Sequence, residues 1–385
     1  MTAQVTGPNE GWRAPSARQR LKVLHVITPS RISGAERIAV AICCGLKERG
    51  HEVMLACKLF SAFPSFAREA GLKCVELDIG GKLNLSAPWR LARLIRERGF
   101  DLIHTHLSTA SLWGSVAGKL TGTPVVAHVH ALNWSPCYLL ADQVLVCSEA
   151  VKKRMERQGI PAHRTRLVHN GIDLSRFRRN LSAGEARRAL GIAPEAFVIG
   201  AVGHLSKKKG QSFLIKAFAT LLQRNPNLIL LLIGEGPDRA ELTGLAASLS
   251  IADKVRFAGY QPDVRPYMNA MDLLVLPSIA GEGLPLVLAE AGAMGIPAVA
   301  ADIGGAREII EHGITGLIIR PRSVEALVGA IGRLVNSPEE RRQMGEKARE
   351  RVEAFFTIER MIDEIESLYE ELCFAGRNAG ILVTP

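Results

Sequence analysis

Short apolar runs alternate with longer amphipathic segments along most of this chain. The runs have the length of strands, and the segments between them repeat their apolar positions at helical spacing. Strands that alternate with helices form parallel sheets, so the pattern predicts an α/β fold. In the first half the predicted strands are 22–28, 52–57, 73–77, 101–104, 125–129 and 143–147.

A second series of the same kind follows the charged stretch 176–188, which places the domain boundary near residue 180. Each half then forms a Rossmann-like doubly wound domain, and the two domains face a cleft at the carboxyl ends of their strands. The second series of predicted strands is 197–202, 228–233, 255–258, 273–276, 298–300 and 317–319. The predicted units are a flexible tail over 1–20, an N-terminal domain over 21–180, a C-terminal domain over 181–356, and a helix over 357–385 that crosses back to the first domain.

Length and composition agree with two soluble domains. The chain has 385 residues, of which 47% are hydrophobic and 22% are charged, so each half can bury its own core. Every apolar run is broken before the roughly 18 residues that a membrane span needs, and the first 20 residues lack the apolar region of a signal peptide. Seven cysteines form no C-x-x-C pair. We therefore expect a cytoplasmic protein with reduced cysteines.

The positive charge lies in the first half. Residues 1–180 hold 26 basic against 13 acidic side chains, a net charge of +13, and the remainder carries −3. This half is either a plain solvated surface or a basic face for anionic lipid or an anionic acceptor. Nucleic acid is disfavoured because no aromatic residues interleave with the basic clusters. Those clusters are Arg90, Arg93 and Arg96, and Lys152, Lys153, Arg154 and Arg157.

Two carboxylates stand out in the second half. Glu282 lies in a glycine-flanked turn, and Glu290 lies eight residues later in the apolar helix that follows. The first turn of that helix offers free backbone N–H groups and a positive dipole end, which suits a phosphate. The spacing fits one ligand lying over the helix start, and equally fits two surface glutamates on an ordinary helix.

The loop 203–210 follows a predicted strand and holds three consecutive lysines before Gly210 and a helix. Cations beside a helix start favour an anion site, although the same loop is typical of a solvated lysine cluster. The turn 234–237 begins like a G-x-G-x-x-G fingerprint but has Arg239 in place of the third glycine. Binding of NAD is therefore weakly supported.

Four histidines, His104, His106, His128 and His130, cluster at the ends of two predicted strands. We expect them to form hydrogen bonds at the strand ends and not to bind metal, because no H-E-x-x-H pattern accompanies them and alternate strand residues are not expected to converge. The sequence also has no Asp-x-Asp, the usual carboxylate pair of a metal-bound nucleotide-sugar. Lysines and helix dipoles must then meet the charge of the leaving group.

Taken together, these segments resemble family 4 of the retaining GT-B glycosyltransferases, and the resemblance extends from Lys22 to about Leu372. Glu282 and Glu290 are similar to the E-x7-E motif of the family. The loop 203–210 is similar to its G-R-L-x-x-x-K-G loop. Two shorter motifs, N-G-[IV]-D and G-x-G-P, are matched by residues 170–173 and 234–237.

The resemblance implies a role for each matching residue. Glu290 would accept hydrogen bonds from the donor ribose, and Glu282 would contact hydroxyls of the transferred sugar. Lys209, with the backbone N–H groups of Gly283 and Leu284, would hold the diphosphate, and His130 would face the donor sugar near O6. No metal or other cofactor is expected, and the departing phosphate would act as the base.

Two positions depart from the family pattern. His204 replaces an arginine in the lysine loop, and it cannot form a bidentate fork with phosphate. Ser33 replaces the first glycine of G-G-A-E, so the close backbone approach to the donor falls to Gly34.

The function that follows is transfer of a hexose-like sugar from a UDP-sugar or GDP-sugar to an envelope glycan or lipid-linked acceptor. The first domain would bind the acceptor and the second the donor, on the cytoplasmic face of the membrane. The alternatives are a GT-B sugar-nucleotide epimerase and a non-catalytic GT-B partner subunit.

Overall fold

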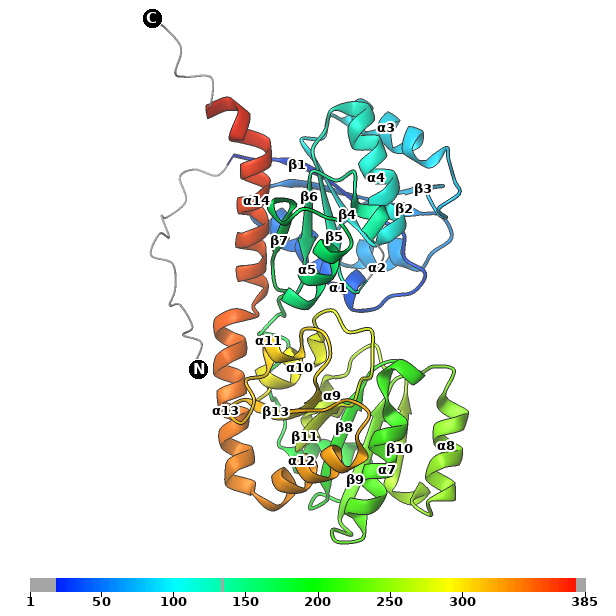
Figure 1. The fold of residues 1–385 in the computed structure, drawn as a ribbon, viewed down its shortest axis with the longest axis vertical. Coiled ribbons are helices and arrows are strands. Elements are labelled where there is room, and N and C mark those ends of the chain that lie inside the picture. The colour runs from blue at the N-terminus through cyan, green and yellow to red at the C-terminus, as the bar shows by residue number, and fades with distance from the viewer. Residues whose placement is uncertain (1–18, 133–134, 379–385) are drawn as a thin grey trace, which may run out of the picture.

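The computed structural model describes residues 19–132 and 135–378 of the chain. It contains two parallel β-sheets, each with helices on both faces, which form two lobes stacked one above the other (Figure 1). The predicted α/β class with two doubly wound halves is confirmed. The tail expected over 1–20 lies outside the described residues except for Gln19 and Arg20, and so do residues 379–385.

The first lobe is built on a seven-stranded sheet of order β3-β2-β1-β4-β5-β6-β7. Six of its strands coincide closely with predicted runs. The seventh, β7, was missed because three residues are too few to show a pattern. The strands are β1 Lys22–Ile27, β2 Glu52–Lys58, β3 Lys73–Leu77, β4 Leu102–His106, β5 Val125–Val129, β6 Gln143–Val146 and β7 Thr165–Leu167.

The second lobe has a six-stranded sheet of order β10-β9-β8-β11-β12-β13. All six strands match the predicted runs to within about a residue at each end. Each run is nearly continuous in apolar residues because a parallel sheet is covered on both faces. The strands are β8 Phe197–Val202, β9 Leu228–Ile233, β10 Val255–Gly259, β11 Leu273–Leu276, β12 Ala298–Ala301 and β13 Gly316–Ile319.

Helices connect the strands in both lobes. In the first half they are α1 Gly34–Glu48, α2 Phe63–Glu69, α3 Ala87–Arg98, α4 Ser108–Thr121 and α5 Glu149–Arg157. After the chain has left the first sheet they are α6 Ala183–Ala189, α7 Gln211–Leu222, α8 Arg239–Ser248, α9 Arg265–Asn269, α10 Leu286–Ala293, α11 Ala306–Ile309, α12 Val324–Asn336, α13 Pro338–Phe355 and α14 Ile358–Asn378. None of the helices in the described ranges is long and apolar enough to cross a membrane.

The helical tail divides where the chain returns to the first lobe. α13 and α14 are separated at Thr357, which forms an isolated parallel bridge with Ile172 in the outgoing segment of the connection. The Ile172 amide donates to the Phe356 carbonyl at 2.9 Å, and the Ile358 amide donates to the Ile172 carbonyl at 3.2 Å. The outgoing and the returning segments are therefore hydrogen-bonded to each other.

Beyond this break, α14 packs along the first lobe, while α13 lies beside the second (Figure 1). The contact with α1 is close: a Cβ atom on Gly45 would lie 2.8 Å from Cγ1 of Ile362. The α14 side of the interface is an apolar stripe at helical spacing, formed by Met361, Ile362, Ile365, Leu368 and Tyr369, all of them buried. The core of the first lobe thus includes residues nearly 350 positions apart.

The topology of both sheets predicts where a ligand site lies. The strand order reverses between β1 and β4 in the first sheet and between β8 and β11 in the second. In open α/β sheets the crevice at such a reversal, outside the carboxyl ends of the strands, is the usual ligand site. The loops that follow β8 and β11 are those that hold Lys209 and Glu282.

We expect Ile362→Ala to destabilise the first lobe, because truncation of a buried isoleucine costs about 2–5 kcal/mol. For a lobe of this size that corresponds to a fall of roughly 4 °C or more in its melting temperature, measured by calorimetry. Ile314→Ala, at a side chain that is 47% exposed, serves as the control and should change little. Equal melting temperatures for both variants would show that α14 is not part of the folded core.

Candidate active site

Two loops meet at the strand-order reversal of the second sheet. One is the lysine loop, residues 203–210, which follows β8. The other is the turn 277–283, which follows β11. Gly210 has φ = +66°, and a Cβ atom there would lie 2.1 Å from the carbonyl oxygen of Pro277. The two loops are therefore in direct backbone contact, and only glycine at position 210 allows it.

Lys209 and Glu282 form an ion pair across this contact. Lys209 Nζ lies 2.5 Å from Glu282 Oε1, and the hydroxyl of Ser278 donates to the same oxygen at 2.5 Å. Glu282 is only 6% exposed, so it is not the surface glutamate that the alternative interpretation would have. An ammonium group has three donors. Lys209 can therefore hold Glu282 and still offer N–H groups to an anion.

A pocket of about 510 Å³ opens beside the lysine loop. Its lining is strongly basic and comes from both lobes, since Arg31 lies in the loop after β1. The lining residues are Arg31, His204, Ser206, Lys207, Lys208, Lys209, Pro237, Asp238, Ala280 and Gly281. A smaller pocket of about 220 Å³, around Ala196 and Asn227, lies where β8 and β9 begin, at the opposite edge of the sheet from the two loops.

Glu290 lies inside α10, two turns beyond the Glu282 turn. Burial raises the pKa of its carboxyl group to about 7, and the positive charges of Arg37 and Arg176 counteract part of that rise. Among the described residues none forms a hydrogen bond with this carboxylate. A carboxyl group that is half protonated near neutral pH and has no partner is typical of a ligand-binding position.

Gly283 brings the Glu282 turn into contact with the first lobe. A Cβ atom on Gly283 would lie 2.3 Å from the carbonyl oxygen of His130. Its own carbonyl accepts hydrogen bonds from the Ser148 hydroxyl at 3.1 Å and from the Gly305 amide at 2.8 Å. The next residue, Leu284, is buried, and its backbone forms a hydrogen bond with Cys147. Burial raises the pKa of the Cys147 thiol to about 12, and the hydrogen bond from Leu284 counteracts part of that rise. In this arrangement the Leu284 amide therefore faces a thiol of the first lobe.

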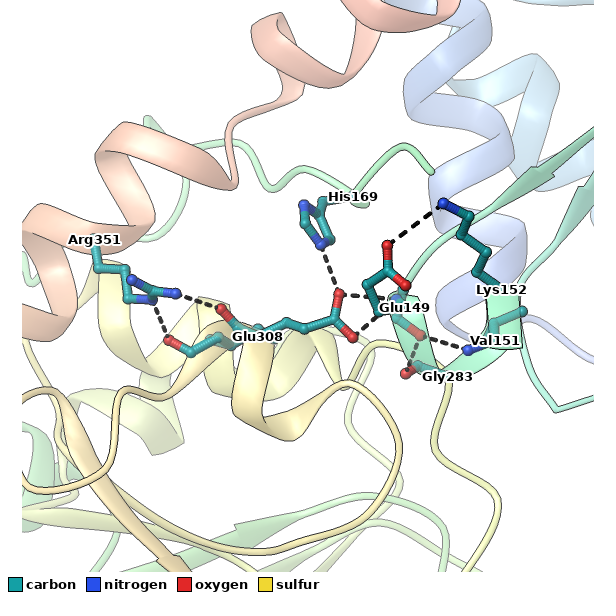
Figure 2. Close-up of polar contacts among 9 residues, drawn as sticks. Glu149, Val151, Lys152, His169, Gly283, Glu308 and Arg351 are labelled. Carbon is teal, nitrogen blue, oxygen red and sulfur yellow. Dashed lines mark hydrogen bonds and ion pairs between the residues drawn. The ribbon is translucent and has the colours of Figure 1, made fainter. Parts of the chain in front are cut away.

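A second polar contact between the lobes surrounds Glu308 of α11 (Figure 2). Both oxygens of its carboxylate accept from the Glu149 amide at 3.0 Å, at the N-terminus of α5, and Oε2 also accepts from His169 at 2.7 Å. Arg351 of α13 donates to the Glu308 carbonyl oxygen at 2.9 Å. A carboxylate at a helix N-terminus is stabilised by the dipole and by the free amides. We call Glu308, Glu149 and His169 the lobe clasp.

Gly34 begins α1 on the opposite side of the cleft. A Cβ atom there would lie 3.6 Å from the Leu286 side chain of α10, so this helix start faces the second lobe. Ser33, which replaces a family glycine, has a structural role instead: its amide and its hydroxyl both donate to the Glu36 carboxylate, at 2.9 and 2.5 Å. The substitution therefore stabilises the helix start next to Gly34.

The histidines lie differently from our expectation. His104, His106, His128 and His130 converge on one face of the first sheet, together with His25 of β1, which sequence reasoning missed. Three of the four form hydrogen bonds, as expected, but the expectation that they do not converge was wrong. β1, β4 and β5 pair in register, His25 with His104 and His106 with His128, so their side chains point to the same side.

Two overlapping groups of three histidines bring one ring nitrogen of each residue within 4.8 Å of the others. They are His25, His104 and His106, and His106, His128 and His130. The expectation that they bind no metal stays a prediction.

Several residues of this region carried little or no signal in the sequence. Ser278 stands inside the glutamate motif, but nothing indicated that its hydroxyl would bind Glu282. Arg31 lies in a polar loop of no marked pattern. The clasp residues His169 and Glu308 lie in different lobes, 139 positions apart, and only the docking of the lobes brings them together.

Comparison with known proteins gives the family of the chain. Residues 182–351 match the family Glycosyl transferases group 1, and residues 32–176 match Glycosyltransferase Family 4. The chain is 30% identical over 318 residues to a D-inositol 3-phosphate glycosyltransferase of Saccharomonospora viridis, with coverage of 74% of this chain and 73% of that one. It belongs to the group 1 glycosyltransferases. It is thus a glycosyltransferase of the GT-B type, which transfers sugar from a nucleotide-sugar.

Two further relatives are similar over nearly their whole length. One is the UDP-Gal:alpha-D-GlcNAc-diphosphoundecaprenol alpha-1,3-galactosyltransferase of Escherichia coli, 22% identical over 383 residues, or 93% of this chain and 98% of the relative. The other is the crystal structure of Anabaena HepE in complex with UDP-glucose. It superposes with a TM-score of 0.81 at 25% identity and covers 91% of this chain and 99% of that one.

We predict that Glu290 titrates near pH 7 in the unliganded protein, as read by NMR of ¹³C-labelled glutamate. Because Arg37 lowers this pKa, Arg37→Ala should raise it further, while Arg188→Ala, far from Glu290 in the sequence and exposed, should not. The folded pKa lies above the ordinary value of 4.5, so the protonated carboxyl stabilises the fold below about pH 4.5 and this contribution is lost as the pH rises through 7. Glu290→Gln should remove that part of the pH dependence. A titration near 4.5 would contradict the burial argument.

Proposed function

We propose that this protein is a retaining hexosyltransferase that uses a UDP-sugar, with a GDP-sugar as the alternative donor. The observation that carries the proposal is the Lys209–Glu282 pair at the strand-order reversal of the second sheet, with the unpartnered Glu290 in the helix that follows. Preference for UDP rests on the E. coli relative, which is named for UDP-Gal, and on HepE, which was crystallised with UDP-glucose.

In this proposal the second lobe binds the donor. Glu290 accepts hydrogen bonds from the ribose, and this needs the charged carboxylate. Lys209 leaves part of its contact with Glu282 to hold the diphosphate, assisted by His204 and by the N–H groups of Gly283 and Gly34. The Leu284 amide, which the resemblance also assigned to the diphosphate, is directed to the Cys147 thiol instead. Glu282 then becomes free to bind sugar hydroxyls. The ion pair between Lys209 and Glu282 satisfies both charged groups when no donor is bound.

The chemistry proposed is attack of the acceptor hydroxyl on the leaving-group side of the sugar, with the departing phosphate taking the proton. The charge that develops on that phosphate is met by Lys209 and by the basic pocket around it. We assign the contact with the transferred sugar to His130, because its backbone carbonyl oxygen lies 2.3 Å from where a Cβ atom of Gly283 would be, next to the Glu282 turn. The absence of an Asp-x-Asp pair in the sequence supports a reaction that needs no metal.

For the acceptor we propose a lipid-linked or envelope glycan at the cytoplasmic face of the membrane. The acceptor named for the E. coli relative is a diphosphoundecaprenol-linked sugar. The basic first lobe would assist by attraction to anionic lipid, although part of that charge is neutralised. Arg90 pairs with Asp78 at 2.6 Å and Arg93 pairs with Glu97 at 2.7 Å. The attraction therefore rests mainly on α5, where Lys153, Arg154 and Arg157 are exposed.

Donor binding and turnover should separate in two variants. Glu290→Ala should weaken binding of the UDP-sugar by about tenfold to a hundredfold, the loss expected when a hydrogen bond to a charged group is removed, while Glu282→Ala should lower mainly kcat. Calorimetric titration with UDP-sugars and GDP-sugars measures the first effect, and a transfer assay run in EDTA measures the second. Lys209→Ala should reduce affinity more than Lys207→Ala, which changes the same charge at an exposed position of the same loop.

Glu241→Ala, at an exposed site on α8, is the control and should behave as wild type. Wild-type binding and turnover in both site variants would overturn the assignment of the site. Donor consumption without an acceptor would favour an epimerase, and donor binding without any turnover would favour a partner subunit. Transfer that stops in EDTA and returns with Mg²⁺ would contradict the metal-independent mechanism.

Binding to acidic vesicles should depend on α5. Each basic residue near an anionic surface contributes about 1 kcal/mol, and salt screens the attraction beyond roughly 8 Å at physiological ionic strength. Co-sedimentation should therefore occur at low salt and decline as salt is added. The double variant Lys153→Glu/Arg157→Glu should weaken it more than Arg90→Glu/Arg93→Glu, which makes the same change in charge where the arginines are already paired. Equal sedimentation with neutral vesicles would refute the electrostatic attraction.

A further inference from the structure

Three of the five clustered histidines form a line of hydrogen bonds. His25 Nδ1 lies 3.0 Å from His106 Nε2, and His106 Nδ1 lies 3.1 Å from His130 Nε2. The middle ring therefore uses both of its nitrogens. The line runs from β1 in the buried interior of the first lobe, through β4, to the end of β5, where His130 meets the Glu282 turn of the second lobe.

The ring planes show that these contacts are hydrogen bonds directed along the rings. The planes of His25 and His106 differ by 14°, with centroids 5.3 Å apart, and those of His106 and His130 by 19°, with centroids 5.4 Å apart. Two rings joined by N···N contacts of 3.0 or 3.1 Å are farthest apart when both nitrogens lie on the line between the ring centroids. The observed centroid separations are close to that largest value, so each nitrogen points straight at its neighbour and the two rings lie in nearly one plane. Lone pairs that face each other along a line do not converge on a common point. The arrangement therefore fits shared protons better than a metal ion.

The other two histidines support this line from the sides. His104 packs against His106 with centroids 4.3 Å apart and is held by the Tyr369 hydroxyl of α14, 2.5 Å from its Nδ1. His128 packs against His130 with centroids 3.9 Å apart. Burial lowers the pKa of all five rings, to about 3 for His25 and His130, so each ring is neutral and carries one N–H group.

Neutral rings restrict the protons to two patterns. Each ring has one donor and one acceptor, so all the N–H groups must point the same way along the line. In one pattern the last N–H group is that of His25 Nε2, which is buried and has no partner among the described residues. Buried N–H groups without an acceptor are rarely tolerated. The other pattern places the last N–H group on Nδ1 of His130, which is also buried and without a partner among the described residues. We favour this second pattern because His130 lies at the contact with the second lobe, where the proposed donor sugar would supply an acceptor oxygen.

We propose that His106 and His25 are positioning residues for His130: through this line they fix its ring and present its Nδ1 as an N–H donor to the donor sugar. The proposal rests on the proposed function for the role of His130, although the hydrogen-bonded line itself does not. His130 Nδ1 has no partner among the described residues, as expected for a donor kept for a ligand.

Nitrogen NMR of the full-length protein with ¹⁵N-labelled histidine tests the line without any mutation. We expect scalar couplings between ring nitrogens across two N–H···N hydrogen bonds, with His106 coupled on both sides, and the Nδ1–H tautomer for His130. Assignments come from the single replacement of each histidine. Absence of both couplings in the wild-type protein would overturn the proposal, whatever the variants show.

Two matched substitutions then test positioning. In His106→Asn the shorter side chain places an amide near the Nδ1 position, so the bond to His130 is kept. In His106→Gln the longer side chain places it near Nε2, so the bond to His25 is kept and the bond to His130 is lost. We expect His106→Gln to lower kcat by roughly threefold to tenfold, as for loss of one hydrogen bond, with a smaller change in KM and a mixed tautomer at His130. His106→Asn should stay closer to wild type in both readouts.

His163→Asn, at an exposed histidine of the same lobe, is the control for kinetics and spectra. Equal kcat values and an unchanged His130 tautomer in His106→Asn and His106→Gln would overturn the positioning role. If wild-type protein transfers no sugar from any donor, the proposed function fails, and the couplings still decide whether the line exists. Should His106→Gln fail to fold, the wild-type couplings and tautomer decide the proposal.

Discussion

The contact between Gly283 and the His130 carbonyl is the point on which the arrangement of the site depends. With a Cβ position only 2.3 Å from that oxygen, no residue but glycine allows the turn after β11 to reach the end of β5. The same turn holds Glu282 beside Lys209, and its carbonyl is fixed by Ser148 of the first lobe. One backbone approach thus sets the distance between the lobes and the position of the charged pair together.

The lobe clasp reinforces this approach from a second direction. Glu308 binds the start of α5, directly after Ser148, while α13 holds the Glu308 backbone through Arg351 (Figure 2). The backbone bridge between Ile172 and Thr357 joins the segment that leaves the first lobe to the segment that returns to it. The charge of Glu308, the dipole of α5 and backbone hydrogen bonds therefore all act at the contact between the two lobes. A donor that binds between the lobes meets surfaces that are already oriented toward each other.

The buried histidines next to this contact lower the stability of the first lobe and hold rings in fixed orientations. Five neutral imidazoles replace apolar side chains on a sheet face that is otherwise packed by α1 and α14, and several of their nitrogens lack partners among the described residues. Unsatisfied buried polar atoms cost about 1–3 kcal/mol each. Residues that reduce stability in this way are common at functional sites, where strict orientation matters more than stability. Their position at the strand-order reversal of the first sheet agrees with that interpretation.

The sequence by itself determined the strands of both sheets except the three-residue β7, because the two-sided burial of parallel strands leaves unbroken apolar runs that can be counted along the chain. It also singled out Glu282, Glu290 and Lys209 as candidate site residues, since each belongs to a local motif of the sequence, and their roles stay predictions. Only the tertiary structure decided that Lys209 binds Glu282, that Glu308 reaches α5, and that His25 joins His106 and His130. These contacts depend on strand register and on the docking of two lobes. Both follow from packing between segments up to 159 positions apart, and no local pattern encodes them.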